Sequence, residues 1–212
     1  MVDYGELKDA VISGKAAKVK ELTQQALNEG KKAQEVLDQA LIPAMDVVGQ
    51  KFSCAEFYIP EMLIAARAMQ GGVALLKPLL AAAGSKARGK VVLGTVKGDL
   101  HDIGKNLVGM MLEGTGFEVV DLGADVKSER FVEAVQKESP NFVMMSALLT
   151  TTMLAMGETI QALKKAGVRD KVKVAIGGAA VTQRFADEIG ADFYSPTATG
   201  GVTKAKELMG IR

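Results

Sequence analysis

The sequence is short of the residues that most often form protein metal sites and disulfides. Its 212 residues include one cysteine, Cys54, one histidine, His101, and no tryptophan. A single cysteine excludes an internal disulfide and favours a reducing compartment, so we expect a cytoplasmic protein. A lone histidine cannot build a zinc or iron site from protein ligands alone.

The chain also lacks an excess of charge of either sign and a long apolar run. Lys and Arg number 26 and Asp and Glu number 25, for a net charge of +1, and no basic cluster indicates a nucleic-acid partner. No run of about 18 apolar residues occurs, which predicts that no membrane span is present. The opening MVDYGELKDA carries early acids and does not read as a signal peptide. The expected protein is soluble, with enough apolar residues for one large core or two small ones.

Residues 1–84 have the spacing of helices. Apolar residues recur every three or four positions after Pro60 and again upstream of it, which predicts amphipathic helices. Pro60 suits the first turn of a helix, whereas Pro43 lies inside the upstream stripe and predicts a kink or a break. Two shorter helices are expected earlier, separated near Ser13 and Gly14. The expected architecture of this part is a four-helix bundle.

From residue 90 to residue 212 the pattern changes to short apolar runs that alternate with amphipathic stretches. This alternation predicts a parallel sheet with helices on both faces, and ligands of such sheets bind beyond the carboxyl ends of the strands. The small, polar segment from Ala83 to Gly89 predicts a linker between the two parts. The expected strands lie at 91–93, 119–122, 142–145, 172–176 and 192–194, and the expected helices near 104–115, 128–138, 152–166, 182–189 and 198–208.

The loop after the first expected strand carries the only histidine. It reads Gly98-Asp99-Leu100-His101-Asp102-Ile103-Gly104. A carboxylate two residues before an imidazole can hold one ring nitrogen and leave the other free to bind a metal. His101 can therefore supply one axial ligand to a metal that a macrocycle already holds.

This loop resembles the Asp-x-His-x-x-Gly signature of base-off/His-on cobalamin-binding domains. That group includes cobalamin-dependent methionine synthase and the corrinoid proteins of methanol, methylamine and O-demethylase methyltransferase systems. Two further marks of the family follow in order, Ser146-Ala147-Leu148 after the third expected strand and Gly177-Gly178 after the fourth. Forty-one residues separate Gly104 from Ser146, and 28 separate Leu148 from Gly177. Both intervals agree with the family pattern. Three ordered motifs are a more specific signal than one short match.

The resemblance implies a cobalamin or related corrinoid cofactor, with His101 as the lower axial ligand of cobalt once the cofactor's own base has left. Asp99 would orient His101, and Gly104 would let the chain approach the cofactor's tail. Thr152 stands where methionine synthase has a serine behind the aspartate, so the hydroxyl is kept although the residue differs. The cofactor-binding positions implied in this part are Asp99, His101, Asp102, Ile103, Gly104, Ser146, Leu148, Thr150, Thr152, Gly177 and Gly178.

The helical part resembles the cap that covers the upper face of the corrin in methionine synthase. The resemblance rests on Val48-Gly49-Gln50-Lys51-Phe52 and on Phe57-Tyr58-Ile59-Pro60-Glu61-Met62. It implies that Phe52 and Ile59 lie over the methyl group, with Met62 nearby. The implied fold is a four-helix cap followed by a Rossmann-like, flavodoxin-like cobalamin-binding domain.

The function implied is that of a methyl carrier. The chain is too short to hold sites for a methyl donor and an acceptor, so no complete active site is expected and its standing as an enzyme is open. A substrate-specific methyltransferase would methylate Co(I), an acceptor methyltransferase would demethylate methyl-Co(III), and a reductive activator is expected as a third partner. The alternatives are a cobalamin-binding sensor, which usually carries a DNA-binding module, and the small subunit of an adenosylcobalamin mutase, which typically lacks a helical cap.

Overall fold

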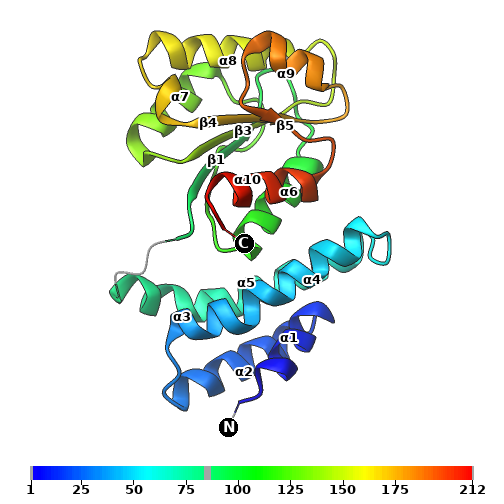
Figure 1. Ribbon diagram of the computed structural model, residues 1–212, viewed down its shortest axis with the longest axis vertical. Coiled ribbons are helices and arrows are strands. Elements are labelled where there is room, and N and C mark those ends of the chain that lie inside the picture. Colours follow the sequence, from blue (N-terminus) through cyan, green and yellow to red (C-terminus); the bar gives the residue numbers. More distant parts are fainter. Residues whose placement is uncertain (1, 84–86, 212) are drawn as a thin grey trace. The chain divides into compact units, whose positions relative to one another are not determined.

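The computed structural model describes residues 2–83 and 87–211. Residues 84–86, the centre of the expected linker, lie outside the described residues. Figure 1 traces the chain through its helical elements and then through the sheet. The chain divides into two compact units, one helical and one built around the sheet. Their bounds are Met1–Ala87 with Met110–Gly116, and Arg88–Gly109 with Phe117–Arg212.

The helical unit has the expected form of a four-helix bundle. Three of its elements, α3, η1 and α4, follow one another directly and act as one rod beside α1, α2 and α5. Buried apolar residues at helical spacing, among them Leu7, Val11, Leu22, Met69 and Leu76, form its core. The elements are α1 (Tyr4–Ile12), α2 (Ala16–Asn28), α3 (Ala33–Val36), the π-helix η1 (Leu37–Leu41), α4 (Ile42–Ser53) and α5 (Ile59–Ala82).

The disturbance expected at Pro43 takes the form of a π-helical turn. The π-helix η1 ends at Leu41, and α4 begins at Ile42, one residue before the proline. In a regular α-helix the proline ring clashes with the carbonyl four residues earlier and removes one hydrogen bond. The wider π-turn makes room for the ring, so the helical path continues through Pro43 instead of breaking.

The stretch Ile59–Leu80 of α5 is long and apolar enough, by length and composition, to cross a membrane. The sequence predicts no membrane span because no run of 18 apolar residues occurs, and Glu61, Arg67 and Lys77 interrupt this stretch. In the structure, α5 packs against α2 and α4, with Met62, Ala65 and Met69 buried in the helical unit. A core helix meets the same criterion of length and hydropathy.

The second unit contains the five strands and five α-helices predicted from the sequence, together with a short 3-10 helix that was not predicted. All strand pairs are parallel, in the order β2-β1-β3-β4-β5. Figure 1 shows α7, α8 and α9 over one face of the sheet and α6 and α10 over the other. The elements are β1 (Lys90–Thr95), α6 (Ile103–Gly114), β2 (Glu118–Asp121), α7 (Ser128–Glu138), β3 (Phe142–Ser146), α8 (Leu154–Lys165), the short 3-10 helix η2 (Arg169–Lys171), β4 (Lys173–Gly177), α9 (Gln183–Ile189), β5 (Phe193–Tyr194) and α10 (Ala198–Leu208).

This strand order decides where a ligand can bind. The chain leaves β1 toward one side of the sheet and leaves β3 toward the other, so the helices after these two strands lie on opposite faces. Such a switch point opens a crevice beyond the carboxyl ends of the two strands. In the sheet register, Thr95 pairs with Ser146 and Ser146 pairs with Gly177. The three strands that carry the sequence motifs therefore end in line at the switch point.

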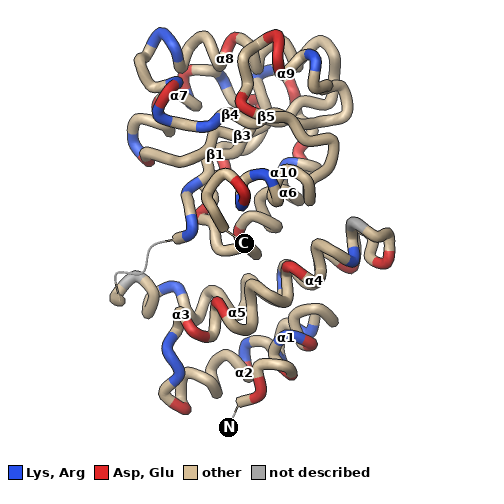
Figure 2. Tube along the Cα trace, viewed as in Figure 1, with Lys and Arg blue, Asp and Glu red and all other residues tan. Residues whose placement is uncertain are grey.

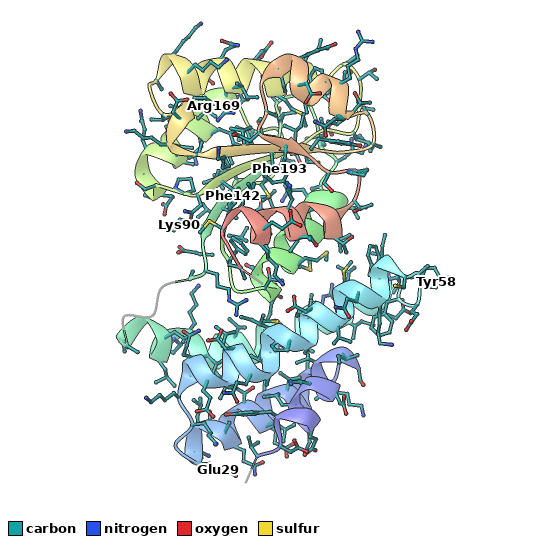
Figure 3. The ribbon with its side chains drawn as sticks, viewed as in Figure 1. Glu29, Tyr58, Lys90, Phe142, Arg169 and Phe193 are labelled. Atoms are coloured by element: carbon teal, nitrogen blue, oxygen red, sulfur yellow. The ribbon has the colours of Figure 1, made fainter. Side chains whose placement is uncertain are left out.

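The sheet is a rigid platform because both of its faces are covered. On the face of α7, α8 and α9, Phe131, Val143 and Ile160 belong to one continuous buried cluster. Phe142 packs edge-on against Phe193 with ring centroids 6.3 Å apart, and Figure 3 shows both residues at the sheet. Strands buried on both faces read as continuous apolar runs, which is why they were recognisable in the sequence.

Charged residues of both signs are interspersed over each unit (Figure 2). Many form ion pairs one helical turn apart, such as Arg184 with Glu188 at 2.8 Å on α9. Exposed pairs of this kind contribute little to stability. The fold therefore depends on its buried apolar contacts and on a few partly buried polar groups.

One such group, Asp192, fastens the amino-terminal edge of the sheet next to β5. Its carboxylate accepts hydrogen bonds from the Arg169 guanidinium at 2.7 Å, from the Val174 N–H at 2.7 Å and from the Lys173 ammonium at 3.1 Å. Figure 3 labels Arg169 at this edge. Burial on its own raises the pKa of Asp192, but the Val174 N–H and the two cations outweigh it and hold the pKa below its ordinary value.

Replacing Asp192 by Asn should destabilise the protein by about 1–2 kcal/mol at pH 7, because the amide loses the charge that its three donors use. A carboxylate with a lowered folded-state pKa stabilises the protein above its unfolded pKa, and the effect is lost as the pH falls below about 4. Urea unfolding at pH 7 and pH 3 should therefore show the difference between Asp192→Asn and wild type shrinking at pH 3. Asp170→Asn, at an exposed acid of η2, serves as the matched control. An equal difference at both pH values would contradict this account.

Candidate functional site

Three loops leave the carboxyl ends of β1, β3 and β4 side by side. Thr95, Ser146 and Gly177 lie near these ends in one line of register. The loop after β1 stays attached to β3, because the Val96 N–H donates to the Ser146 carbonyl at 3.0 Å. The three sequence motifs are thus brought together at one edge of the sheet.

The loop after β1 begins with a tight turn that places Asp99. The Asp99 N–H donates to the Val96 carbonyl at 3.1 Å, and Gly98, the third residue of the turn, has a φ of 81°. A type II turn needs a positive φ at that position, which glycine adopts without strain. The turn directs Asp99 inward, and its side chain is fully buried.

The Asp99 carboxylate is hydrogen-bonded on both oxygens. Oδ1 accepts from the His101 N–H at 3.0 Å and lies 2.8 Å from His101 Nδ1. Oδ2 accepts from the Leu148 N–H at 2.8 Å and from the Thr152 hydroxyl at 2.6 Å. The loops after β1 and β3 therefore meet at one carboxylate.

These hydrogen bonds keep Asp99 ionised. Burial on its own raises the pKa of Asp99, but hydrogen bonds from Thr152, from the His101 and Leu148 N–H groups and from the His101 ring hold the pKa well below its ordinary value. An ionised carboxylate can only accept hydrogen bonds, so His101 Nδ1 carries the proton that it shares with Asp99. In the neutral imidazole, the other ring nitrogen, Nε2, then has a free lone pair.

His101 lies at the surface amid apolar side chains. Its side chain is 53% exposed, whereas that of Asp99 is fully buried. Leu100 and Ile103, its neighbours in the loop, are 75% and 74% exposed. Across the edge of the sheet, Leu148, Leu149 and Leu154 are also exposed. A group of exposed apolar side chains around one polar group is typical of a ligand or partner site.

The residues at this edge fit a corrinoid. One outward-facing imidazole nitrogen suits an axial position of cobalt, and the apolar side chains around it suit the broad face of a macrocycle. A Cβ built at Gly104 would meet nothing within 4 Å, so the packing of the chain does not require glycine there, and its missing side chain leaves room beside α6. Within residues 2–83 and 87–211, no three His, Cys, Asp or Glu side chains are grouped to hold a bare metal ion.

The other residues predicted for this site lie on the same loops. Ser146 is half-buried at the end of β3, whereas Leu148 and Thr150 are exposed in the loop that follows. Asp102 accepts a hydrogen bond from the Asn106 side chain at 2.9 Å at the start of α6. The contacts of these side chains, and of Ile103, with a cofactor stay predictions.

The two glycines after β4 have different surroundings. A Cβ at Gly177 would lie 3.5 Å from the Ser195 carbonyl oxygen, which is an ordinary contact. At Gly178, where φ is 125°, a Cβ would lie 1.9 Å from the Ala147 carbonyl oxygen. Gly178 is therefore required by the close approach of the chain's own backbone, whatever its role toward a cofactor. A role for either glycine in lining a slot stays a prediction.

The three residues predicted to cover the corrin belong to the helical unit. Phe52 is half-buried near the end of α4, and Ile59, the first residue of α5, is 43% exposed. Met62, one turn further along α5, is 1% exposed and lies in the core of that unit. Cys54, which follows α4, is exposed. Contact of these residues with a cofactor stays a prediction.

Sequence reasoning missed two polar residues beside the site. The Lys105 side chain is 1% exposed, and its ammonium group bonds to the Asp121 carboxylate at the end of β2 and to the Asn106 side chain. Asp125, in the loop after β2, accepts a hydrogen bond from the Gly98 N–H at 2.7 Å. A lysine at the third position of a largely apolar helix was the available sign for Lys105, whereas the partner of Asp125 lies 27 residues away in sequence.

Removing the Thr152 hydroxyl should disturb Asp99 without disturbing packing. Thr152→Val keeps the side-chain volume but loses one hydrogen bond to Asp99, so the pKa of Asp99 should rise toward its ordinary value and stability should fall by about 1–2 kcal/mol at pH 7. Thr152→Ser keeps the donor and should behave like wild type. Carbon-13 NMR titration of the Asp99 carboxyl and urea unfolding measure the two effects. An unchanged Asp99 titration in Thr152→Val would remove the hydroxyl from this account.

Comparison with known proteins identifies the family. Two models, each described as a B12 binding domain, match residues 89–202 and residues 4–77. A dimethylamine corrinoid protein of Methanosarcina barkeri is 45% identical over 206 residues, which are 96% of each chain. A cobalamin-binding protein of Desulfitobacterium hafniense DCB-2 of known structure is 34% identical, with a TM-score of 0.79 and coverage of 98% of both chains.

A second solved structure agrees with the first. The methanol:cobalamin methyltransferase complex MtaBC of Methanosarcina barkeri contains a chain that is 35% identical, with a TM-score of 0.89. The alignment covers 97% of this chain and 78% of that one. The sheet-bearing unit and the helical unit are thus both covered by the similarity to proteins named for cobalamin or corrinoid. The chain belongs to the B12-binding family of corrinoid proteins, and its cofactor is a corrinoid.

Proposed function

We propose that this chain is a methyl carrier that passes a methyl group between two methyltransferases, with His101 as the lower axial ligand of its corrinoid. The observation that carries the proposal is the buried, ionised Asp99 bonded to His101 Nδ1, with the imidazole half exposed among apolar side chains. A bound corrinoid supplies a cobalt centre that accepts a methyl group when fully reduced and gives it up to a nucleophile.

The chain's own part is to hold an imidazole that can attach to cobalt and detach from it. The negative charge of Asp99 makes Nε2 of His101 a stronger donor. The Thr152 hydroxyl and the Leu148 N–H share that charge and moderate the effect. The backbone of His101 is anchored on both sides, because its N–H bonds Asp99 and its carbonyl accepts from the Thr95 hydroxyl at 3.0 Å. Movement of the ring therefore need not move the sheet.

The proposed partners are a substrate-specific methyltransferase, an acceptor methyltransferase and a reductive activator. Two of the similar proteins carry names that point to different methyl donors, dimethylamine and methanol. The dimethylamine protein is 45% identical and the methanol complex 35%, so the proposal favours a methylated amine as donor. A reduced cobalt centre needs a reducing environment, so the proposal includes a cytoplasmic location.

The first test is reconstitution of the purified chain with hydroxocobalamin. We expect a bound corrinoid whose Co(II) form shows nitrogen splitting from His101 in electron paramagnetic resonance. His101→Ala should retain most of the cofactor, because the loops after β3 and β4 remain, but it should lose the splitting and at least tenfold in methyl-transfer rate. Methyl transfer is measured with a dimethylamine methyltransferase and a thiol acceptor enzyme, and a methanol methyltransferase is the comparison donor.

The outcomes of this test separate the parts of the proposal. A chain that takes up no corrinoid would contradict cofactor binding at this site. Nitrogen splitting that survives in His101→Ala would rule out this histidine as the ligand. A wild-type protein that binds the corrinoid through His101 but receives a methyl group from neither donor enzyme would contradict the role of carrier.

We also propose that residues 1–84 act as the cap of the cobalamin-binding domain, residues 90–212. By the resemblance to methionine synthase, Phe52 and Ile59 shield the upper face of the corrin, and the cap must move away when a partner delivers or removes a methyl group. Phe52 is half-buried and Ile59 is 43% exposed, so both residues have apolar surface available for that role.

Loss of the Phe52 ring should leave corrinoid uptake largely intact but speed the oxidation of the reduced cobalt by oxygen. The physical reason is that a smaller side chain shields less of the upper face. The oxidation rate is measured by stopped-flow absorbance of Phe52→Ala after reduction. We expect it to increase about threefold or more, because the substitution removes one large apolar side chain. Phe57→Ala, on the same segment, is the matched control. Oxidation of Phe52→Ala at the wild-type rate would exclude Phe52 as a shield.

A further inference from the structure

We infer that Asp125, in the loop between β2 and α7, is a positioning residue for the cobalt ligand, because it holds in one conformation the turn that aims Asp99 at His101. The inference rests on the proposed function as far as cobalt is concerned. The turn itself is a property of the chain without its cofactor, so the two can be tested separately.

Asp125 holds the turn through its side chain and through its backbone. One carboxylate oxygen accepts from the Gly98 N–H at 2.7 Å, and the Asp125 N–H donates to the Asp99 carbonyl at 3.0 Å. The next residue continues the attachment, since the Val126 N–H donates to the Thr95 carbonyl at 2.9 Å. The loop after β2 therefore contacts the turn on both sides of Gly98.

The hydrogen bond to Gly98 controls the least restricted peptide of the turn. The Gly98 N–H belongs to the peptide that joins Lys97 to Gly98, which is the central peptide of the turn from Val96 to Asp99. Type I and type II turns differ by a rotation of this peptide. Glycine tolerates both conformations, so residue type alone does not select one of them. The side chain of Asp125 selects one of them, because rotation of the peptide would break the 2.7 Å hydrogen bond between the Gly98 N–H and the Asp125 acceptor oxygen.

The backbone of Asp125 is itself held in an uncommon conformation. Its φ is 53°, a left-handed value that few residues other than glycine adopt and that aspartate and asparagine tolerate best. Such conformations persist where several surrounding contacts require them. Glycine would relieve the strain but remove the carboxylate, so the presence of aspartate points to the side-chain contact as the reason for the residue.

Asp99 is therefore held from both neighbouring strands. The loop after β3 binds its carboxylate through Leu148 and Thr152. The loop after β2 holds its backbone through Asp125. Rotation of the turn would shift the Asp99 oxygen away from His101 Nδ1, and the ring would lose the hydrogen bond that orients it. A ligand held by a supporting group of this kind attaches in one geometry.

Three substitutions at Asp125 separate the effect of its carboxylate from the effect of its left-handed backbone conformation. Asp125→Asn keeps an acceptor oxygen and tolerates the left-handed conformation, so it should behave like wild type. Asp125→Ala and Asp125→Gly both lose the acceptor, and only glycine relieves the strain. Nitrogen-15 NMR of the cofactor-free protein should show microsecond-to-millisecond exchange at the Gly98 and Asp99 amides in the alanine and glycine variants only.

The second measurement uses the protein reconstituted with hydroxocobalamin and reduced to Co(II). We expect wild-type uptake in all three variants, with the equilibrium between nitrogen-ligated and unligated cobalt shifted about tenfold toward unligated in the alanine and glycine variants. Thermal unfolding is followed in parallel. If the alanine variant does not fold, the glycine variant answers the same question, since it lacks the same carboxylate.

The possible results decide the inference. The inference is overturned if Asp125→Gly shows no exchange at the Gly98 and Asp99 amides and keeps wild-type cobalt ligation. It is also overturned if Asp125→Asn behaves like Asp125→Ala, because the acceptor oxygen then does not hold the turn. A wild-type chain that binds no corrinoid defeats the proposed function instead. In that case the amide exchange still decides whether Asp125 holds the turn.

Discussion

The site depends on one buried negative charge, the Asp99 carboxylate. A charge without solvent must be fully hydrogen-bonded, or the group is neutralised. Here the donors come from the histidine loop itself and from the loop after β3, at separations of 2, 49 and 53 residues. His101 can stay exposed because the residue buried in the sheet unit is its partner, Asp99. The carboxylate thus joins two requirements, a rigid attachment to the sheet and an imidazole nitrogen that faces outward.

The sheet assigns different tasks to its two edges. At the carboxyl edge, loops after parallel strands converge at the switch point between β1 and β3, and the functional side chains gather there. At the amino-terminal edge, Asp192 accepts hydrogen bonds from Arg169, Lys173 and the Val174 N–H, and these bonds fasten β4 to the start of β5.

Much of the fold could be predicted from the sequence because it depends on local periodicity. Parallel strands buried on both faces appear as apolar runs, and surface helices appear as stripes, so every strand and α-helix of the sheet unit was expected near its observed place, whereas the short 3-10 helix η2 was not. Pro43 shows the limit of this reasoning. Its missing N–H predicts a disturbance of the helix, but the choice of a π-turn over a break depends on the packing of the surrounding bundle.

The candidate site divides in the same way. The spacing of Asp99 and His101 is local, so their contact could be expected from two residues in one loop, and the resemblance to known motifs supplied the importance of Ser146 and Gly177. The resemblance also placed the Thr152 hydroxyl behind Asp99, where the structure has it. The attachment of Leu148 and Asp125 to that loop could not be expected, because it requires β1 to lie between β2 and β3 in a particular register. Strand order and register are set by the packing of the whole chain, and no local pattern encodes which distant donor reaches a buried carboxylate.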